Sequence, residues 1–216
     1  MRTIQRIVRR AEIEVEFSKG FNPHMSLSIA QPLAVGVYSS GDYLDLVLNS
    51  SMDEREIVEK LNINAPNGVE FLEAVSVCKI EGKKLPQAMA AIDAARYTIT
   101  MTVNNKNIGE KEVEDLLKKE QWEILKKSKS SERIVDIKPQ IKEITFCEKE
   151  NQFIIKVLVS CGSKENLSPQ LLSEFIINNT FFIDKEKFVD IKREELYVYK
   201  DNIYSTLGEY FRKESM

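Results

Sequence analysis

The segment at residues 18–24 contains the residue types in this sequence that are best suited to bind or transform a ligand. Its members are Ser18, Lys19, Gly20, Phe21, Asn22, Pro23 and His24, and His24 is the single histidine of the 216-residue chain. Gly20 permits a close backbone approach or a positive φ, and Pro23 fixes the turn after Asn22. Asn22 and His24 would then present a donor and an acceptor from a stiff loop. The pattern predicts a loop that binds a ligand or a partner.

Two other interpretations of the same residues are open. Asn22 could cap its own turn, and His24 could be a hydrogen-bonded structural histidine. Alternatively, His24 could act in an enzyme on a small or nucleotide substrate. The sequence places no carboxylate or nucleophile beside His24, so the catalytic residues stay unassigned.

Basic residues at two places could contact an anion such as phosphate or RNA. The first group lies on a predicted N-terminal helix and consists of Arg2, Arg6 and Arg9, which share one face, together with Arg10. The second group lies in a predicted polar loop between strands and consists of Lys126, Lys127, Lys129 and Arg133. Such groups can follow a phosphate backbone, although a solvated loop is the commoner role. Tyr197 and Tyr199 share one face of a predicted strand and could stack on bases or pack at an edge.

Composition limits the class of protein. The apolar fraction of 43% and the charged fraction of 30% are typical of a globular protein. A net charge of -3 argues against wrapping of nucleic acid over the whole surface. No apolar stretch is long enough to span a membrane, and the first residues do not resemble a signal peptide. We therefore expect a cytoplasmic protein that does not act at a membrane.

The cysteines and the known sequence motifs exclude several chemistries. Cys78, Cys147 and Cys161 are far apart and form no C-x-x-C pair, so with one histidine they cannot make an ordinary zinc site. The chain has no C-x-x-x-C-x-x-C, G-x-x-x-x-G-K-[ST] or G-x-G-x-x-G sequence. We expect no bound metal and no cofactor, and an accessory role is favoured over catalysis.

The elements that must position these residues fall into two α+β units. Residues 1–82 predict a helix, strands at 13–17, 26–30 and 43–48, a helix and a strand at 69–77, with a loop at 31–41. The second of these helices is expected to be capped by Ser50 or Ser51, with Asp53 and Glu54 in its first turn. This order is that of a ferredoxin-like βαββαβ unit without its initial strand. In that topology the first strand lies inside the sheet, so its absence would leave a gap. Either a strand from another chain fills the gap, which would give an oligomer, or the natural start lies upstream of Met1.

The second half predicts a related unit. A helix at 85–95 precedes strands at 97–103, 122–126, 135–148, 153–160 and 190–199, with helices at 110–119 and from Ser168 onwards. We therefore predict an α+β fold with two ferredoxin-like units and antiparallel sheets, at residues 1–82 and 83–200. Residues 201–216 predict a tail or a short amphipathic helix.

Residues 18–24, followed by A-Q-P-L-A-V-G at residues 30–36, resemble the signature of the radical-SAM-linked protein family. Genes of that family lie beside, or are fused to, those of radical-SAM proteins, so the resemblance implies a radical-SAM protein as partner. The chain departs from the pattern at Met25 and Ala34, where the family usually has proline. It also lacks the family's N-terminal strand and the Ser-His-Leu-Asp-like stretch after it.

Three hypotheses follow. The first is a non-catalytic accessory protein that works with a radical-SAM enzyme and presents an RNA substrate to it. The second is an enzyme that uses the Asn22 and His24 loop. The third is a structural subunit whose incomplete sheet is completed by another chain.

Overall fold

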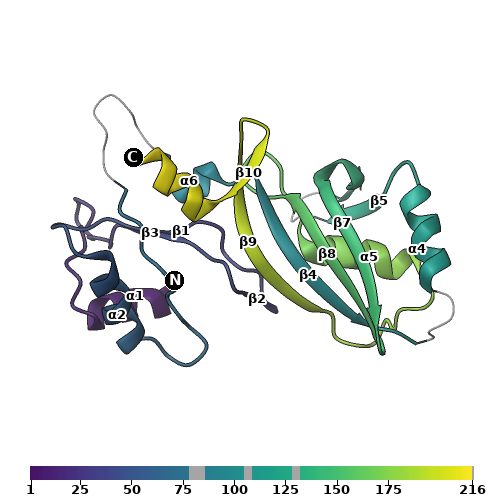
Figure 1. The fold of residues 1–216 in the computed structure, drawn as a ribbon, viewed down its shortest axis with the longest axis horizontal. Coiled ribbons are helices and arrows are strands. Elements are labelled where there is room, and N and C mark those ends of the chain that lie inside the picture. Colours follow the sequence, from purple (N-terminus) through teal and green to yellow (C-terminus); the bar gives the residue numbers. More distant parts are fainter. Residues whose placement is uncertain (78–85, 105–108, 128–131, 216) are drawn as a thin grey trace. The chain divides into compact units, whose positions relative to one another are not determined.

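The computed structural model describes residues 1–77, 86–104, 109–127 and 132–215 (Figure 1). It divides into two compact units: residues 1–32, 43–91 and 205–216 form the first, and residues 33–42 and 92–204 form the second. Helices and antiparallel-dominated sheets occur together, so the predicted α+β class is confirmed. The predicted boundary at residue 82 lies outside the described residues.

The first unit is built around the apolar face of its N-terminal helix. Helix α1 (Arg2–Arg10) buries Ile7 and Val8, which are adjacent in sequence and point to the same side together with Ile4. Strands β1 (Leu27–Ile29) and β3 (Leu44–Leu46) pair antiparallel. Helix α2 (Glu54–Ile63) begins after Asp53, whose carboxylate accepts hydrogen bonds from two backbone N–H groups of the first turn. The shared core consists of Ile7, Val8, Ala11, Ile13, Val15, Met25 and Leu61.

The strand predicted at residues 69–77 is wrong. No strand forms there, because side chains of α2 take the hydrogen bonds that a neighbouring strand would have made. Asn62 Nδ2 donates to the Phe71 carbonyl at 2.8 Å, and the Phe71 N–H donates to Asn62 Oδ1 at 2.8 Å. The Ser76 N–H donates to Glu54 at 2.5 Å. Leu72 is 68% exposed, so the apolar alternation of this segment does not correspond to a buried face.

The second unit has the ferredoxin-like order. Its main elements are β4 (Ala94–Thr102), α4 (Gly109–Lys118), β7 (Ile141–Lys149), β8 (Gln152–Ser160), α5 (Pro169–Asn179) and β9 (Asp190–Lys200). The strands lie in the order β9-β4-β8-β7, and neighbours are antiparallel. Read along the chain, this is the fourth, first, third and second strand of a βαββαβ unit. Strand β10 (Ile203–Thr206) extends the sheet beside β9.

The two faces of this sheet differ in composition. Along β4, Tyr97, Ile99 and Met101 are buried, whereas the threonines between them are half-buried. Helix α5 lies against the sheet (Figure 1), and its Phe175 stacks on Trp122 with ring centroids 4.9 Å apart. The indole N–H of Trp122 donates to the Leu116 carbonyl at the end of α4. Trp122 is therefore buried against both helices.

Several predicted bounds need correction. The strand predicted at 135–148 is split into β6 (Glu132–Asp136) and β7 by a short 3-10 helix at Lys138–Gln140, because Pro139 has no N–H to continue a strand. Strand β6 pairs with β5 (Glu123–Lys127) as a separate hairpin. The helix predicted at 85–95 is only α3 (Ala88–Ala91), since β4 already begins at Ala94. Within residues 201–216, for which a tail or a short helix was predicted, the structure has helix α6 (Leu207–Glu214).

Residues 31–41, predicted to be a loop, contain strand β2 (Val37–Ser39). It pairs in parallel with β9 of the second unit, with Val37 opposite Ile191 and Ser39 opposite Arg193. The short strand is flanked by Gly36 and Gly41, which is why its sequence is typical of a loop. Its placement depends on partners that are about 150 residues further along the chain.

Candidate functional site

The predicted binding loop, residues 18–24, is the tip of a hairpin. Phe17 and Met25 form an antiparallel bridge at its base. The Ser18 N–H donates to the His24 carbonyl at 2.8 Å, and the His24 N–H donates to Ser18 Oγ at 2.9 Å. Gly20 has a φ of +150°, which side-chain-bearing residues rarely adopt. The loop is therefore closed by backbone groups and by Ser18.

The base of the loop is anchored in the core of the first unit. Met25 and Val15 are buried members of that core. The Ser26 N–H donates to the Glu16 carbonyl, and the Glu16 N–H donates to the Val47 carbonyl, each at 2.8 Å. Two neighbouring segments thus hold the backbone on which the loop stands, which limits its freedom before any partner binds.

The side chains of the loop are left available to a partner. The exposed side chains of the loop include Lys19, Phe21, Asn22, Pro23 and His24. The relative accessible surface of Phe21 is 101%, so no other residue covers its ring. Within the part of the chain that the structure describes, neither Asn22 nor His24 has a side-chain hydrogen bond or ion pair. The interpretations in which Asn22 caps its own turn, or His24 is held by a structural hydrogen bond, have no contact to support them. Ser18 closes the loop instead.

The arginines predicted to contact an anion lie along the outside of α1. Arg2, Arg6, Arg9 and Arg10 are exposed, and none of them has an ion-pair partner among the described residues. The helix has no acidic residue in its first turn. The structure therefore places the motif loop and these four arginines in the same unit.

The second predicted basic group is on the β5–β6 hairpin of the other unit. Lys126 lies directly opposite Arg133 in the strand register, which places two like charges side by side. Lys127 ends β5, and Lys129 lies outside the described residues. This hairpin belongs to the second unit, whereas the motif loop belongs to the first.

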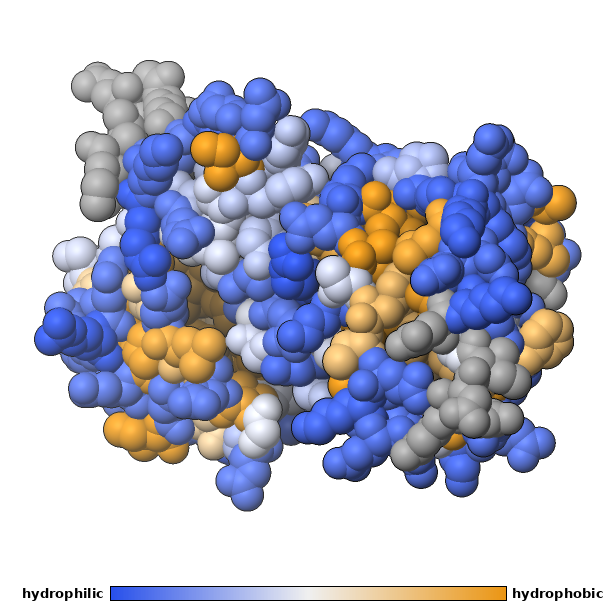
Figure 2. All heavy atoms as spheres, turned by 45° about the vertical axis from the view of Figure 1, so that its right-hand side comes forward, coloured by the Kyte–Doolittle hydropathy of each residue, from blue (hydrophilic) through white to orange (hydrophobic). Residues whose placement is uncertain are grey.

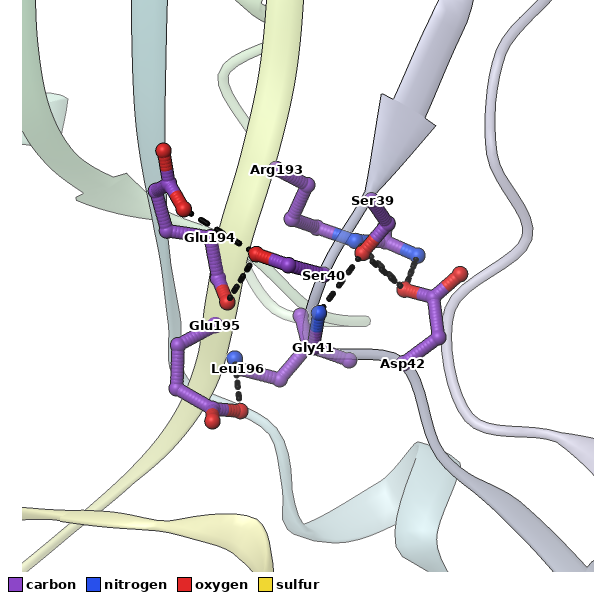
Figure 3. Close-up of polar contacts among 8 residues, drawn as sticks. All are labelled: Ser39, Ser40, Gly41, Asp42, Arg193, Glu194, Glu195 and Leu196. Carbon is purple, nitrogen blue, oxygen red and sulfur yellow. Dashed lines mark hydrogen bonds and ion pairs between the residues drawn. The ribbon is translucent and has the colours of Figure 1, made fainter. Parts of the chain in front are cut away.

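Sequence reasoning missed a buried ion pair that holds residues 33–42 on the second unit (Figure 3). Arg193 on β9 is 1% exposed, and its Nε donates to Asp42 Oδ1 at 2.9 Å while its Nη2 donates to the same oxygen. The Ser40 hydroxyl donates to Glu194 Oε2 at 3.0 Å. A Cβ on Gly41 would lie 2.3 Å from the Glu194 carbonyl oxygen, so only glycine fits there. The signal in the sequence was an arginine at an inward position of an alternating strand.

Burial around Arg193 also affects two neighbours. Burial raises the pKa of the Tyr97 hydroxyl. It raises the pKa of the Cys161 thiol to about 11, although the nearby Arg193 cation acts in the opposite direction. Cys161 is therefore a protonated thiol at neutral pH, which agrees with a structural role. Cys147 is exposed, and Cys78 lies outside the described residues.

The tyrosines on β9 belong to a larger aromatic group. Tyr204 on β10 has its ring centroid 4.7 Å from that of Tyr199 and 6.4 Å from that of Tyr197. Arg96 lies over the Tyr197 ring at 5.6 Å and forms an ion pair with Glu143 at 2.8 Å. These side chains already contact one another, so the group packs the edge of the sheet as well as facing outwards.

The described residues contain no group of three or more His, Cys, Asp and Glu side chains that could hold a metal ion. In the same ranges, no helix has the length and apolar character needed to cross a bilayer. Hydrophobic residues do reach the surface in patches bordered by hydrophilic ones, as Figure 2 shows. Exposed examples are Phe21, Ile134, Phe181 and Phe188.

Together these features define an α+β protein with one ferredoxin-like unit and an exposed loop that is closed by hydrogen bonds at its base. The chain belongs to the family described as "Uncharacterized protein conserved in bacteria (DUF2344)", whose model matches residues 1–169. No curated protein matches the sequence.

Among solved structures, one chain from a "Crystal Structure of a Cbf5-Nop10-Gar1 Complex" is similar, with a TM-score of 0.46 and 11% identity. The match covers 89% of this chain and 44% of that chain, so this chain spans less than half the length of that protein. At this score the similarity has no bearing on function.

Proposed function

We propose that this protein is a non-catalytic accessory protein that binds a radical-SAM enzyme through the loop at residues 18–24. The observation that supports this most directly is Phe21, which is 101% exposed at the tip of a loop that is closed by hydrogen bonds between Ser18 and His24. A radical-SAM enzyme is named as the partner because the loop sequence resembles the signature of the radical-SAM-linked family.

Exposure of Phe21 favours binding over catalysis. Transfer of a phenylalanine ring from water into a partner's pocket is favourable, and aromatic anchors of this kind dominate many protein interfaces. The loop is held before binding, so little conformational entropy is lost on association. Asn22 and His24 follow Phe21 in the loop, and their side chains have no hydrogen-bond partner among the described residues, so they can donate and accept hydrogen bonds across an interface.

The cysteine content is consistent with a pair of proteins in which only the partner carries out radical chemistry. The chain lacks the three-cysteine sequence that binds the iron–sulfur cluster of a radical-SAM enzyme. Radical chemistry would therefore be supplied by the partner, and this protein would supply a binding surface.

Affinity purification of the full chain from its native host, followed by mass spectrometry, tests the proposal. We expect a radical-SAM enzyme to be captured by the wild type and largely lost with Phe21→Ala. A hot-spot residue contributes about 2 kcal/mol or more, which corresponds to a loss of affinity of roughly 30-fold. The matched control is Phe188→Ala, which removes a ring that is 73% exposed in the second unit. Equal capture by wild type and Phe21→Ala, or capture of no radical-SAM protein, would overturn the proposal.

A further inference from the structure

Helix α1 presents a concentrated positive charge that has no counterpart within the described chain. Four of its nine residues are arginines, and all four are exposed. The whole protein has a net charge of -3, so this surface is opposite in sign to the average. Three arginines elsewhere in the chain are paired internally: Arg96 with Glu143, Arg193 with Asp42 and Arg212 with Glu73.

We propose that the arginine face of α1 binds the phosphate backbone of a nucleic acid, with RNA as the substrate class. The inference deepens the proposed function, on which it rests, because it names what the accessory protein would present to its partner enzyme. It depends on α1 and not on the motif loop, so the two proposals can fail separately.

The geometry of α1 brings the four guanidinium groups onto one side. At about 100° per residue, Arg2, Arg6, Arg9 and Arg10 all lie within a sector of roughly 100°. At about 1.5 Å per residue they span roughly 12 Å along the axis. The guanidinium group is planar and forms paired hydrogen bonds with phosphate oxygens, which a lysine ammonium cannot do.

The opposite face of α1 argues against a membrane surface as the anion. An amphipathic helix that binds lipid inserts its apolar face into the bilayer. In this protein that face is occupied: Ile7 is 2% exposed, Val8 is 0% exposed and Ala11 is 4% exposed in the core of the first unit. Only the charged face is accessible, so binding would be electrostatic, as it is for a phosphate backbone.

The acidic residues that follow the helix limit the length of the contact. Glu12, Glu14 and Glu16 are exposed on the segment after α1 and would repel a polyanion there. The footprint is therefore confined to the helix and to at most four neutralised phosphates. A plot of the logarithm of the binding constant against the logarithm of the salt concentration should then be no steeper than about -3.6 on duplexes, or about -2.8 on single strands.

The test is a fluorescence-anisotropy titration of the full chain, without any partner enzyme, on a labelled RNA single strand and on RNA and DNA duplexes. Between 50 and 200 mM KCl we expect affinity to fall by up to about 150-fold on a duplex. The variant Arg2→Gln/Arg6→Gln should bind more weakly, and its affinity should fall only about 12-fold over the same range, because two phosphate contacts are gone.

The control variant is Lys185→Gln/Lys187→Gln, which removes the same charge from exposed positions in the second unit and should bind like the wild type. Melting curves of all variants should coincide, since the substituted side chains are exposed. Absence of binding at 50 mM KCl, or equal loss in both double variants, would overturn the inference. Tighter binding of poly-glutamate than of RNA would overturn it in favour of an acidic protein, and preference for the DNA duplex would overturn RNA as the substrate class.

Discussion

Removal of the Asp42 carboxylate should destabilise the second unit strongly. Asp42→Ala leaves the Arg193 guanidinium, which is 1% exposed, without the carboxylate that balances its charge. Loss of one partner from a buried ion pair costs about 3–5 kcal/mol, because an uncompensated charge remains in the interior. Asp42 is itself 36% exposed, so water can enter the vacated position. We therefore expect about 3 kcal/mol, the lower end of that range.

The opposite deletion should cost less. Arg193→Met leaves the Asp42 carboxylate, which can be hydrated because it reaches the surface. The double variant Asp42→Ala/Arg193→Met contains no buried charge at all, so it should be more stable than Asp42→Ala alone. This order of variant stabilities is expected only for an ion pair in which the cation is buried and the anion reaches the surface.

Urea unfolding followed by tryptophan fluorescence measures these differences. Trp122 is the single tryptophan of the chain, it is 1% exposed, and it lies in the second unit, so its emission reports unfolding of the unit that contains Arg193. The control is Glu114→Ala, which breaks an exposed pair with Lys118 in the same unit and should cost less than about 0.5 kcal/mol. A change below about 1 kcal/mol for Asp42→Ala, or a double variant less stable than Asp42→Ala, would refute the reasoning.

Two further predictions concern titratable groups. Iodoacetamide at pH 8 should alkylate the exposed Cys147 in the folded protein and leave Cys161 unmodified until urea is added, because Cys161 is buried and its burial raises the thiol pKa to about 11. Peptide mass spectrometry after a short pulse of reagent measures the labelling of each cysteine. Labelling of Cys161 before urea is added would contradict the prediction. Stability should fall as the pH drops below about 4.5, partly through Glu194. Burial alone would raise the pKa of Glu194, but hydrogen bonds from Lys192, Thr98 and Ser40 outweigh burial and lower it. A lowered pKa means that the folded state binds the proton less readily, so the contribution is present above the ordinary value of 4.5 and is lost on acidification. Melting temperatures from pH 6 to pH 3 should therefore decline less steeply for Glu194→Gln than for the wild type, and parallel declines would show that Glu194 does not contribute.

The sequence predicted correctly those elements whose formation depends on local patterns. Helix α1 follows from the spacing of Ile4, Ile7 and Val8, and α5 from Ser168 and Pro169 at its start, where the Ser168 hydroxyl accepts from the Leu171 N–H. Strand β4 alternates apolar residues with threonines from Tyr97 onwards, whereas β8 is an almost continuous apolar run, which is typical of a strand buried on both faces. These signals are strong because each element satisfies its own backbone or repeats its pattern over several turns or residues.

The local setting of the candidate site residues was predictable where it depends on nearby residues in the sequence. The loop at residues 18–24 was identified from Gly20, Pro23 and the side chains between and beside them, since glycine and proline restrict the backbone wherever they occur. Arg2, Arg6 and Arg9 of α1 were likewise placed on one face by helical periodicity alone. The exposure of Phe21 and the lack of partners for Asn22 and His24 could not be predicted, because exposure depends on what the rest of the chain covers.

Segments whose partners are distant in sequence were decided only by tertiary structure. Strand β2 has three residues, and its pairing with β9 joins positions about 150 residues apart, with Asp42 and Arg193 completing the contact. Residues 69–77 alternate like a strand but are held by Asn62 and Glu54 instead. A sequence determines which backbone conformations are low in free energy for each segment. Which donor meets which acceptor, and which charge is buried, depends on the folded chain as a whole, because these energies arise between residues that only folding brings together.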